Sequence, residues 1–452
     1  MTHSFSYDYK GKTHYFVFHP FSSSLHEVDY AAFLVIKRRY ESLTAQEEQD
    51  YSALDKTEVA EILSEVEELE SQNLLATDVE VPYKKSNIVK ALCLHICHDC
   101  NLRCEYCFAK EGTYNTARDY MSAEVGKKAI DFLIEHSGGR HNLEVDFFGG
   151  EPLMNIDVVK QIVDFGKKRA KECDKEFSFT MTTNCLLLSE DNIKFLNEEM
   201  DNVVLSIDGR KSVHDAVRKT RNGNSCYDVI YNNAKNFRAV RGNKRYYVRG
   251  TFTNKNIDFC NDVLFLAKDF DQISVEPVVL DPNHPLAIRK EQIPQILEEY
   301  EKLSREYLKA WEEGHPFNFF HFMLDLDTSP CLSKKLSGCG VGCEYLAVSP
   351  VGDIYPCHQF VGGSKEYYMG NVLEGTFNTD VQDRFRENTV YRKKGCKDCF
   401  AKYHCSGGCT ASALNFEGDI YTPYKEACEM MKKRLEVSLA IQAIIREESS
   451  EN

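Results

Sequence analysis

Three cysteines lie close together directly after an apolar run. Cys100, Cys104 and Cys107 are separated by three and then two residues, so one loop can supply three thiolates to a single metal centre. A [4Fe–4S] cube normally takes four thiolates. The nearest other cysteines, Cys93 and Cys97, alternate on the preceding predicted strand and are expected to pack rather than to ligate. The spacing therefore predicts a [4Fe–4S] cluster with one iron that has no protein ligand.

Polar residues and glycines follow the later predicted strands. Gly149, Gly150 and Glu151 end the second strand, where glycine allows close backbone approach to a ligand and a carboxylate suits an ammonium group. Ser206 and Asp208 share one face of the fourth strand, suited to hydroxyl or amino groups. The remaining candidates are an amide after the third strand and two cations that could bind a carboxylate: Asn184, Arg218 and Arg249.

These motifs resemble those of the radical S-adenosylmethionine (SAM) enzymes. The tricysteine loop matches that family's signature, and Gly149–Pro152 matches its GGEP motif. The resemblance implies that the open iron chelates SAM through its methionine amino and carboxylate groups, with Tyr106 against the adenine. One electron would then cleave SAM to a 5′-deoxyadenosyl radical. The polar residues named above would contact SAM, with Arg218 favoured over Arg249 for its carboxylate.

A second concentration of cysteines lies near the C-terminus, and part of it follows a C-x2-C-x5-C-x3-C pattern. Zinc also binds four cysteines, but a zinc ribbon needs two C-x2-C pairs and only one is present, which favours iron–sulfur clusters. The cysteines of this zone that could bind metal are Cys339, Cys343, Cys357, Cys396, Cys399, Cys405, Cys409 and Cys428.

This second zone resembles the SPASM extension of peptide-modifying radical SAM enzymes, which carries two auxiliary [4Fe–4S] clusters. The resemblance assigns the second auxiliary cluster to Cys396, Cys399, Cys405 and Cys428. It assigns the first to Cys343, Cys357 and Cys409, with Cys339 as a possible fourth ligand. The spacing to Gly352 fits the family range from Cys339 and is short from Cys343, so three or four protein ligands both stay open. The chain is thus expected to bind three [4Fe–4S] clusters and SAM.

Strand-like and helix-like segments alternate from about residue 88 to residue 314. Six β/α units in series imply a parallel sheet with functional residues at the C-terminal ends of its strands. No Gly-x-Gly-x-x-Gly follows the first strand, so an α/β fold with a partial, TIM-like (β/α)6 barrel is favoured over a doubly wound sheet. The predicted strands are 91–97, 143–148, 177–183, 202–208, 246–253 and 273–280. The predicted helices between them are 122–137, 155–173, 189–199, 226–241 and 256–269.

The segments on either side of the barrel form the other predicted domains. Residues 1–85 show three short strands and two capped helices, which indicates a winged-helix-like module or a packing extension of the barrel. The barrel is assigned to 86–314, and a cysteine-rich SPASM domain closed by a helix at about 425–446 is assigned to 315–452.

Composition limits the classes of partner. The chain has 452 residues and a net charge of −15, which argues against a nucleic-acid partner. No apolar run reaches the length of about 18 residues expected of a membrane span, and no signal peptide opens the chain. A cytoplasmic protein is expected, and the clustered ones among its 18 cysteines then indicate metal binding rather than disulfides.

The order of the three predicted domains resembles that of the sactipeptide maturases, most closely the maturases of SCIFF peptides, which are short cysteine-rich precursors. Residues 1–85 would be a RiPP recognition element that adds the leader peptide to its sheet as a strand. The resemblance implies a thioether between a peptide cysteine and an α-carbon, with an external donor such as flavodoxin or ferredoxin. The first auxiliary cluster would accept one electron and offer an open iron to the substrate thiolate.

Two alternatives remain open. Sulfatase maturases combine the same barrel and SPASM domain to oxidise cysteine or serine to formylglycine, although they usually lack the N-terminal element. A peptide-binding protein stabilised by zinc or clusters, without catalysis, is the other. No residue stands out by spacing as the catalytic proton acceptor.

Overall fold

The computed structural model describes residues 2–75, 80–83, 86–326 and 331–451, with the side chains of 450 and 451 left aside. Eleven strands form one sheet, in the order β12-β11-β10-β8-β7-β6-β4-β13-β14-β15-β16. Its parallel strands include all six that the sequence predicted, in the predicted order, and the α/β class with a partial barrel is confirmed. Their bounds are Ala91–Cys97 (β4), Asn142–Gly149 (β6), Glu176–Thr183 (β7), Asn202–Ser206 (β8), Arg245–Phe252 (β10), Gln272–Pro277 (β11) and Asn318–Phe319 (β12).

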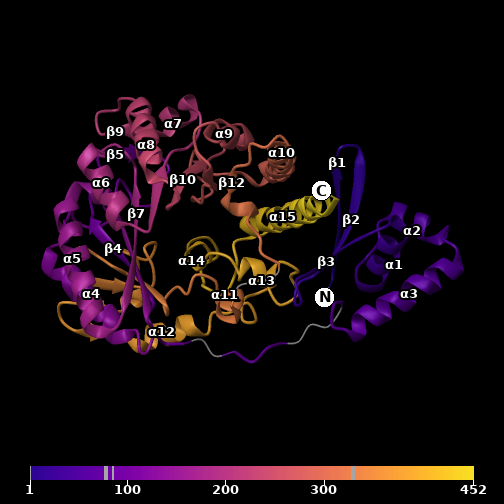
Figure 1. Ribbon diagram of the computed structural model, residues 1–452. Helices are drawn as coiled ribbons and strands as arrows, with labels where there is room; N and C mark the ends of the chain where they lie inside the picture. Colours follow the sequence, from indigo (N-terminus) through magenta and orange to yellow (C-terminus); the bar gives the residue numbers. More distant parts are fainter. Residues whose placement is uncertain (1, 76–79, 84–85, 327–330, 452) are drawn as a thin grey trace.

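Helices cover the outer face of the curved sheet (Figure 1). The side chains of strand β4 explain why the helices cover this face. Leu92, Leu94 and Ile96 pack in the main hydrophobic core with the helices, while Cys93 packs in a separate cluster on the opposite face. Strand alternation therefore directs Cys93 and His95 toward the inside of the barrel. The helices are α4 (Ala123–His136), α5 (Ile156–Cys173), α6 (Glu190–Glu199), α7 (Lys211–Val217), α8 (Tyr227–Arg241), α9 (Phe259–Leu266) and α10 (Ile293–Glu312).

The cysteine-rich segment continues the barrel sheet instead of forming a separate one. Strand β13 (Tyr345–Val348) pairs in parallel with β4, and the antiparallel strands β14 (Asp353–Tyr355), β15 (Gly370–Asn371) and β16 (Thr376–Phe377) extend it. Sequence patterns did not predict these strands because two to four residues are too few to show a period. The short helices of this segment are α11 (Leu332–Ser337), α12 (Thr379–Arg386), α13 (Lys402–Cys405) and α14 (Thr410–Glu417).

The N-terminal unit is a three-stranded antiparallel sheet with three helices, α1 (Tyr30–Tyr40), α2 (Ala45–Ser52) and α3 (Lys56–Ser71). Its strands are β1 (His3–Tyr9), β2 (Lys12–His19) and β3 (Ser24–Val28). Helix α2 begins at the predicted capping box of Thr44 and Glu47, and α3 begins after Asp55. The sequence pattern did not predict α1, because its four consecutive buried residues, 33–36, show no helical period. In the structure α1 contacts both the sheet and α3.

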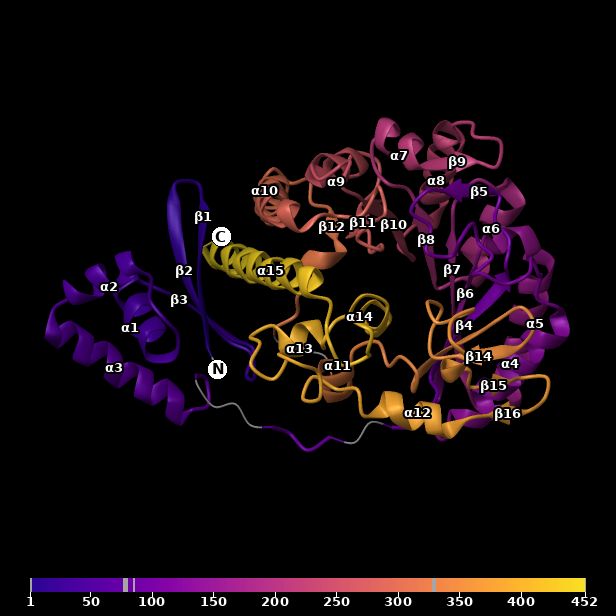
Figure 2. The same ribbon diagram turned by 180° about the vertical axis from the view of Figure 1, so that it is seen from behind.

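Helix α15 (Lys425–Glu451) joins all three parts of the chain. Figures 1 and 2 show it running from the cysteine-rich region to the N-terminal sheet. It packs along α10, and its Glu436 Oε1 lies 2.9 Å from Nε2 of His3 on β1. The β1 residue Tyr9 also donates a 2.7 Å hydrogen bond to Glu312 at the end of α10. None of the helices in the described ranges is both long and apolar enough to span a lipid bilayer.

Two glycines let the end of β6 pack against the chain that leaves β4. Gly149 has φ +113°, and an added Cβ there would lie 2.5 Å from the Cys97 carbonyl oxygen. At Gly150, the added Cβ would lie 1.9 Å from the carbonyl oxygen of Asp99, the residue before the first cysteine of the motif. The two glycines therefore set the position of the tricysteine loop.

We expect Gly150→Ala to lower the free energy of unfolding by about 2–4 kcal/mol, because the methyl group collides with rigid backbone. Gly139→Ala is the matched control: its added Cβ meets nothing within 4 Å, and we expect a change within about 0.5 kcal/mol. Urea unfolding under anaerobic conditions measures both. Equal stabilities of the two variants would show that the close approach at Gly150 is not a constraint.

Candidate active site

The tricysteine loop is held in place at several points. Cys104 lies on the short strand β5 (Leu102–Cys104), which pairs antiparallel with β9 (Arg218–Thr220) so that Cys104 lies opposite Arg218. The Cys100 amide donates to the Asp99 carboxylate at 2.9 Å, and Arg221 pairs with the same carboxylate. Asp99 and Arg221 were not predicted as site residues, although each lies within three residues of one that was.

Burial opposes the thiolate form of Cys100, and hydrogen-bond donors near the loop sulfurs favour it. Burial raises the pKa of the Cys100 thiol, and the nearby Glu151, Cys104 and Cys107 raise it further. Donors reach the sulfurs: Asn184 Nδ2 lies 3.6 Å from Cys100 Sγ, and Arg218 Nε lies 3.5 Å from Cys104 Sγ. Such donors stabilise thiolates and help to set the reduction potential of a cluster that the thiolates bind.

The spacing of the cysteines fits a cube better than a zinc ion. Four thiolates around zinc at 2.3 Å would be about 3.8 Å apart. Within the described residues, the one group of three or more metal-binding side chains whose ligand atoms lie within 4.8 Å of one another contains no cysteine. The three cysteines of the loop therefore do not all lie within 4.8 Å of one another, although they are near enough to interact electrostatically, and this separation is wider than that of zinc ligands.

Tyr106, Asp208 and Arg218 form a buried network beside the loop. The Tyr106 hydroxyl donates to the two Asp208 carboxylate oxygens at 2.7 and 2.9 Å, and the Thr251 amide donates to the same group at 3.0 Å. Arg218 Nη1 donates to the Ser206 carbonyl at 2.6 Å and lies 3.7 Å from Asp208. Burial raises the pKa of Asp208, while Arg218 opposes that shift. The structure thus brings together five of the predicted residues, Cys104 included.

Glu151 connects the ends of β6 and β7. Its carboxylate accepts hydrogen bonds from Thr183 Oγ1 at 2.8 Å and from the Asn184 amide at 2.7 Å. Burial raises the pKa of Glu151 to about 7. Both carboxylate oxygens of Glu151 are therefore already hydrogen-bonded within the protein. Glu151 positions Asn184, whose side chain donates to Asn101 Oδ1 at 2.7 Å and approaches Cys100.

Arg249 lies apart from this network. It is next to Ser206 in the sheet, but its charge acts on Glu276, which Arg434 of α15 contacts at 3.2 Å and His321 at 3.4 Å. Burial would raise the pKa of Glu276, but His321, Arg434 and Arg249 lower it to about 2. No motif marks Glu276, His321 and Arg434, because they come from three distant segments.

The predicted second auxiliary group assembles as one set. Burial, Cys405 and Cys399 act on the Cys396 thiol and raise its pKa to about 11. Burial, Cys405, Cys396 and Cys399 likewise raise the pKa of Cys428 to about 12. Cys428 lies in the first turn of α15, so the structure brings this helix to the three cysteines of the C-x2-C-x5-C run.

The four candidates for the first auxiliary group do not share one environment. Burial raises the pKa of the Cys357 thiol, and Cys409, Cys339 and Cys93 add to the shift. Cys343 is fully buried in the main hydrophobic core, where its thiol donates to the Gln382 carbonyl at 3.3 Å. Cys339 and Cys409 thus lie near enough to Cys357 to affect its pKa, and the Cys343 thiol is directed toward α12.

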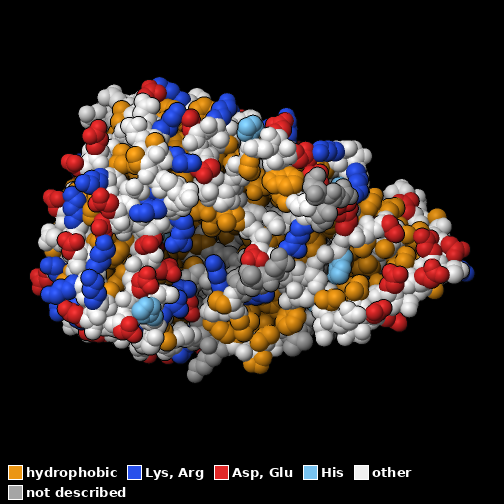
Figure 3. Space-filling model, in the orientation of Figure 1, with side chains coloured by type: hydrophobic (Ala, Val, Ile, Leu, Met, Phe, Trp, Pro, Cys, Tyr) orange, Lys and Arg blue, Asp and Glu red, His pale blue; other side chains and the backbone are white. Residues whose placement is uncertain are grey.

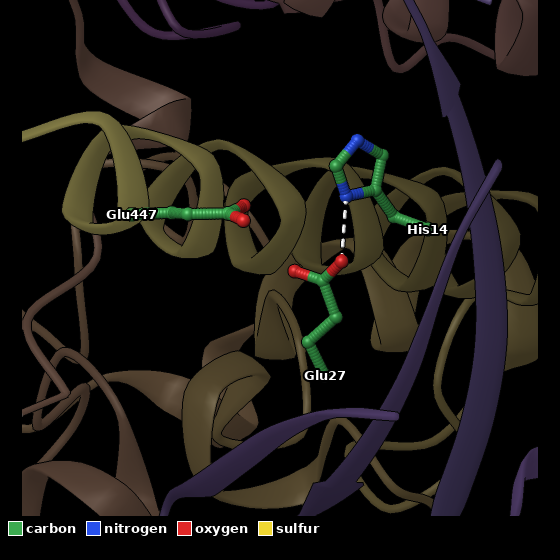
Figure 4. Close-up of side chains that lie close together, drawn as sticks. All are labelled: His14, Glu27 and Glu447. Carbon is green, nitrogen blue, oxygen red and sulfur yellow. Dashed lines mark hydrogen bonds and ion pairs between the residues drawn. The ribbon is translucent and has the colours of Figure 1, made fainter. Parts of the chain in front are cut away.

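A further group of metal-binding side chains lies at the junction of the N-terminal sheet and α15. Figure 4 shows His14 of β2 and Glu27 of β3 near Glu447 of α15, with His14 Nδ1 2.9 Å from Glu27. The Lys12 ammonium lies 3.2 Å from Glu27 and 3.8 Å from Glu447. Lysine thus already balances these carboxylates, and we interpret the group as a docking contact.

The two arginines that the sequence left as candidates can be separated by SAM binding. We expect Arg218→Gln to weaken SAM binding at least about tenfold, because a charge-assisted hydrogen bond contributes about 1.5–3 kcal/mol. Arg249→Gln should change it by less than about twofold. Equilibrium dialysis with labelled SAM on anaerobically reconstituted protein measures both, and the reverse order would assign the carboxylate contact to Arg249.

Comparison with known proteins agrees with this geometry. Residues 94–257 match the radical SAM superfamily, and residues 339–400 match the iron–sulfur cluster-binding domain called SPASM. The radical SAM cyclopropyl synthase TigE of Paramaledivibacter caminithermalis is 23% identical over 92% of this chain and 90% of its own length. The cysteine-type anaerobic sulfatase-maturating enzyme of Clostridium novyi is 28% identical over 69% of this chain and 85% of its own.

Solved structures show the same fold. The structure of anSMEcpe with bound AdoMet superposes with a TM-score of 0.67 at 21% identity, covering 79% of this chain and 96% of that one. Streptococcus suis SuiB bound to S-adenosylmethionine gives a TM-score of 0.51 at 16% identity, covering 91% of this chain and 96% of that one. The tricysteine loop, the glycines of β6 and the second cysteine zone agree with the two domain matches: the chain carries a radical SAM domain and an iron–sulfur cluster-binding SPASM domain.

Proposed function

We propose that this chain is a peptide-modifying radical SAM enzyme that forms thioether crosslinks between cysteine sulfur and an α-carbon in a ribosomally made, cysteine-rich precursor. The observation that carries the proposal is that Cys339 and Cys409 lie near Cys357 while the Cys343 thiol donates to the Gln382 carbonyl, which supports three protein ligands for the first auxiliary cluster. Three thiolates leave one iron of a [4Fe–4S] cube without a protein ligand. That iron would hold the substrate sulfur.

The first auxiliary group and the tricysteine loop face the same interior. Phe108 follows Cys107 and His358 follows Cys357, and the two rings lie 5.7 Å apart. The His358 ring also lies 5.0 Å from that of Phe148 on β6. A peptide held inside the barrel would therefore lie between the two metal-binding groups, with an α-carbon near one and a sulfur near the other.

In this proposal the residues of the chain bind and orient SAM and exclude water, while SAM and its cluster supply the radical. When bound, SAM and its cluster supply a 5′-deoxyadenosyl radical that takes a hydrogen atom from the substrate. Arg218 and Asp208 provide charges of opposite sign for the methionine end of SAM, and Asn184 aligns the loop through Cys100. Enclosure by the barrel excludes water and competing hydrogen donors. Forming the thioether then removes one proton and one electron from the substrate, the electron going to the first auxiliary cluster.

The N-terminal unit supports recognition of a leader peptide. Strand β3 lies at the edge of its sheet, and in the described part of the chain it pairs with β2 alone. An extended peptide can add to such an edge through main-chain hydrogen bonds. Hydrophobic side chains also gather on this unit, at the right of Figure 3, and Tyr30 beside β3 is 36% exposed. These are the surfaces that a partly apolar leader would contact.

The proposed reaction requires an electron donor and iron–sulfur clusters. Reductive cleavage of SAM consumes one electron per turnover, so the proposal includes an external one-electron donor of the flavodoxin or ferredoxin class. It includes three [4Fe–4S] clusters, bound by the loop, by the first auxiliary group and by Cys396, Cys399, Cys405 and Cys428.

Formylglycine formation is the second candidate function. The similarity to sulfatase-maturating enzymes favours it, since they share the barrel fold and a large part of the chain. Against it, the structure of anSMEcpe leaves a fifth of this chain uncovered, whereas TigE and SuiB each match more than nine tenths.

Mass spectrometry of a co-expressed cysteine-rich peptide with its leader distinguishes the two. We expect each crosslink to remove two hydrogens and to retain sulfur. Cys100→Ala, which removes a ligand of the radical-generating cluster, is the control and should leave the peptide mass unchanged. Loss of sulfur would show formylglycine chemistry instead, and absence of deoxyadenosine from SAM under reducing, anaerobic conditions would show a non-catalytic protein.

Iron analysis of two single variants tests the ligation of the first auxiliary cluster. We expect Cys339→Ala to lose about one cluster's iron per chain, because it leaves two thiolates. Cys343→Ala should retain full iron and lose about 1–2 kcal/mol of stability, because it removes a buried thiol from the core. Loss of the cluster in both variants would indicate four protein ligands and no open iron for the substrate.

A further inference from the structure

Lys393 is a buried cation without a carboxylate partner. It is 4% exposed, and its ammonium group donates to the Gly407 carbonyl at 2.8 Å and to the Gly408 carbonyl at 3.4 Å. Its neighbours Arg392 and Lys394 form ion pairs with acidic residues, and no ion pair among the described residues involves Lys393. A buried ammonium needs a compensating negative charge.

The groups around Lys393 that can become negative are cysteines from both auxiliary sets. Burial lowers the pKa of Lys393, and the charges that oppose this shift belong to two cysteines of the second set and two of the first. These four cysteines are Cys396, Cys405, Cys409 and Cys339. A [4Fe–4S] cube ligated by thiolates carries net negative charge, so cubes bound by the two sets would supply the missing compensation for the ammonium.

The hydrogen bonds of Lys393 place it where the two sets meet. Cys405 belongs to the second set and Cys409 to the first, and Ser406, Gly407 and Gly408 join them. The amides of Gly407 and Gly408 donate toward the Cys405 sulfur, while their carbonyls accept from Lys393. Gly407 has φ +83°, and an added Cβ would lie 2.6 Å from Lys393 Cδ, so the lysine packs directly on this connection.

We propose that Lys393 is a shared counter-charge for the two auxiliary clusters and raises their reduction potentials. Each cluster gains one negative charge when it is reduced, and a fixed buried cation stabilises that state more than the oxidised state. The inference rests on the proposed function in one respect, the presence of iron–sulfur clusters at these cysteines. It adds a reason why they can accept an electron from a substrate-derived radical: the cation lowers the energy of the reduced cluster.

A redox titration followed by electron paramagnetic resonance tests the inference on the full chain, reconstituted anaerobically. The background variant C100A/C104A/C107A removes the ligands of the SAM-binding cluster, so that the signals come from the auxiliary clusters. In this background, we expect Lys393→Gln to move the midpoint potential of at least one auxiliary cluster to a more negative value. Lys393→Arg keeps the charge and should stay close to the unmodified protein.

Lys394→Gln is the matched control. Lys394 is the next residue, its side chain is 70% exposed, and it pairs with Asp419 at 3.4 Å. Because solvent screens an exposed charge, its loss should leave both midpoints unchanged. The paired variants thus separate a buried, local charge from the general loss of a lysine in this segment.

Iron content accompanies each titration. Full iron with unchanged midpoints in Lys393→Gln overturns the inference. If Lys393→Gln loses iron, Lys393→Met is titrated as a second uncharged variant: full iron and unchanged midpoints there also overturn it, whereas iron and potential restored by Lys393→Arg alone support it. Stoichiometric zinc in place of iron would overturn the clusters themselves, and the metal analysis distinguishes that failure from a wrong role for Lys393.

Discussion

The close approach of the β6 end to the start of the tricysteine loop is the constraint on which the site depends. Gly149 and Gly150 leave no space for side chains against Cys97 and Asp99, so the loop cannot shift away from the strand ends without breaking this contact. The ladder of β5 and β9 then places Cys104 opposite Arg218. Two backbone contacts, rather than a set of flexible side chains, therefore position the predicted radical-generating centre.

Helix α15 gives the rest of the molecule a similar fixed geometry. One helix carries Cys428 in its first turn, Arg434 against Glu276 at the barrel interior, and Glu436 against His3 of the N-terminal sheet. A helix is stiff along its axis, with a rise of 1.5 Å per residue. The distances between the second auxiliary site, the barrel interior and the N-terminal unit are thus fixed by the number of α15 residues that separate their contacts.

Buried charge follows one rule across the site. Arg218 is balanced by Asp208 and lies beside the Cys104 sulfur, and Glu276 is balanced by Arg434 and His321. Lys393 has cysteines in the corresponding place. At these three places a buried charge lies next to a charge of opposite sign or next to sulfur that becomes anionic when it binds metal, which explains how these charges are compatible with a stable fold.

The sequence by itself determined the barrel strands, the tricysteine loop and the cysteine zone, because strand periodicity and ligand spacing are local properties of the chain. It also predicted Tyr106, Asp208 and Arg218 as contacts of one ligand, and the three side chains lie together. It did not determine α1, the pairing of β13 with β4, or the hydrogen bond from the Cys343 thiol to the Gln382 carbonyl. Only the tertiary structure decided these, and also the contacts of Glu276 and Lys393, because each depends on segments that are far apart in the chain and carry no mutual signal in their spacing.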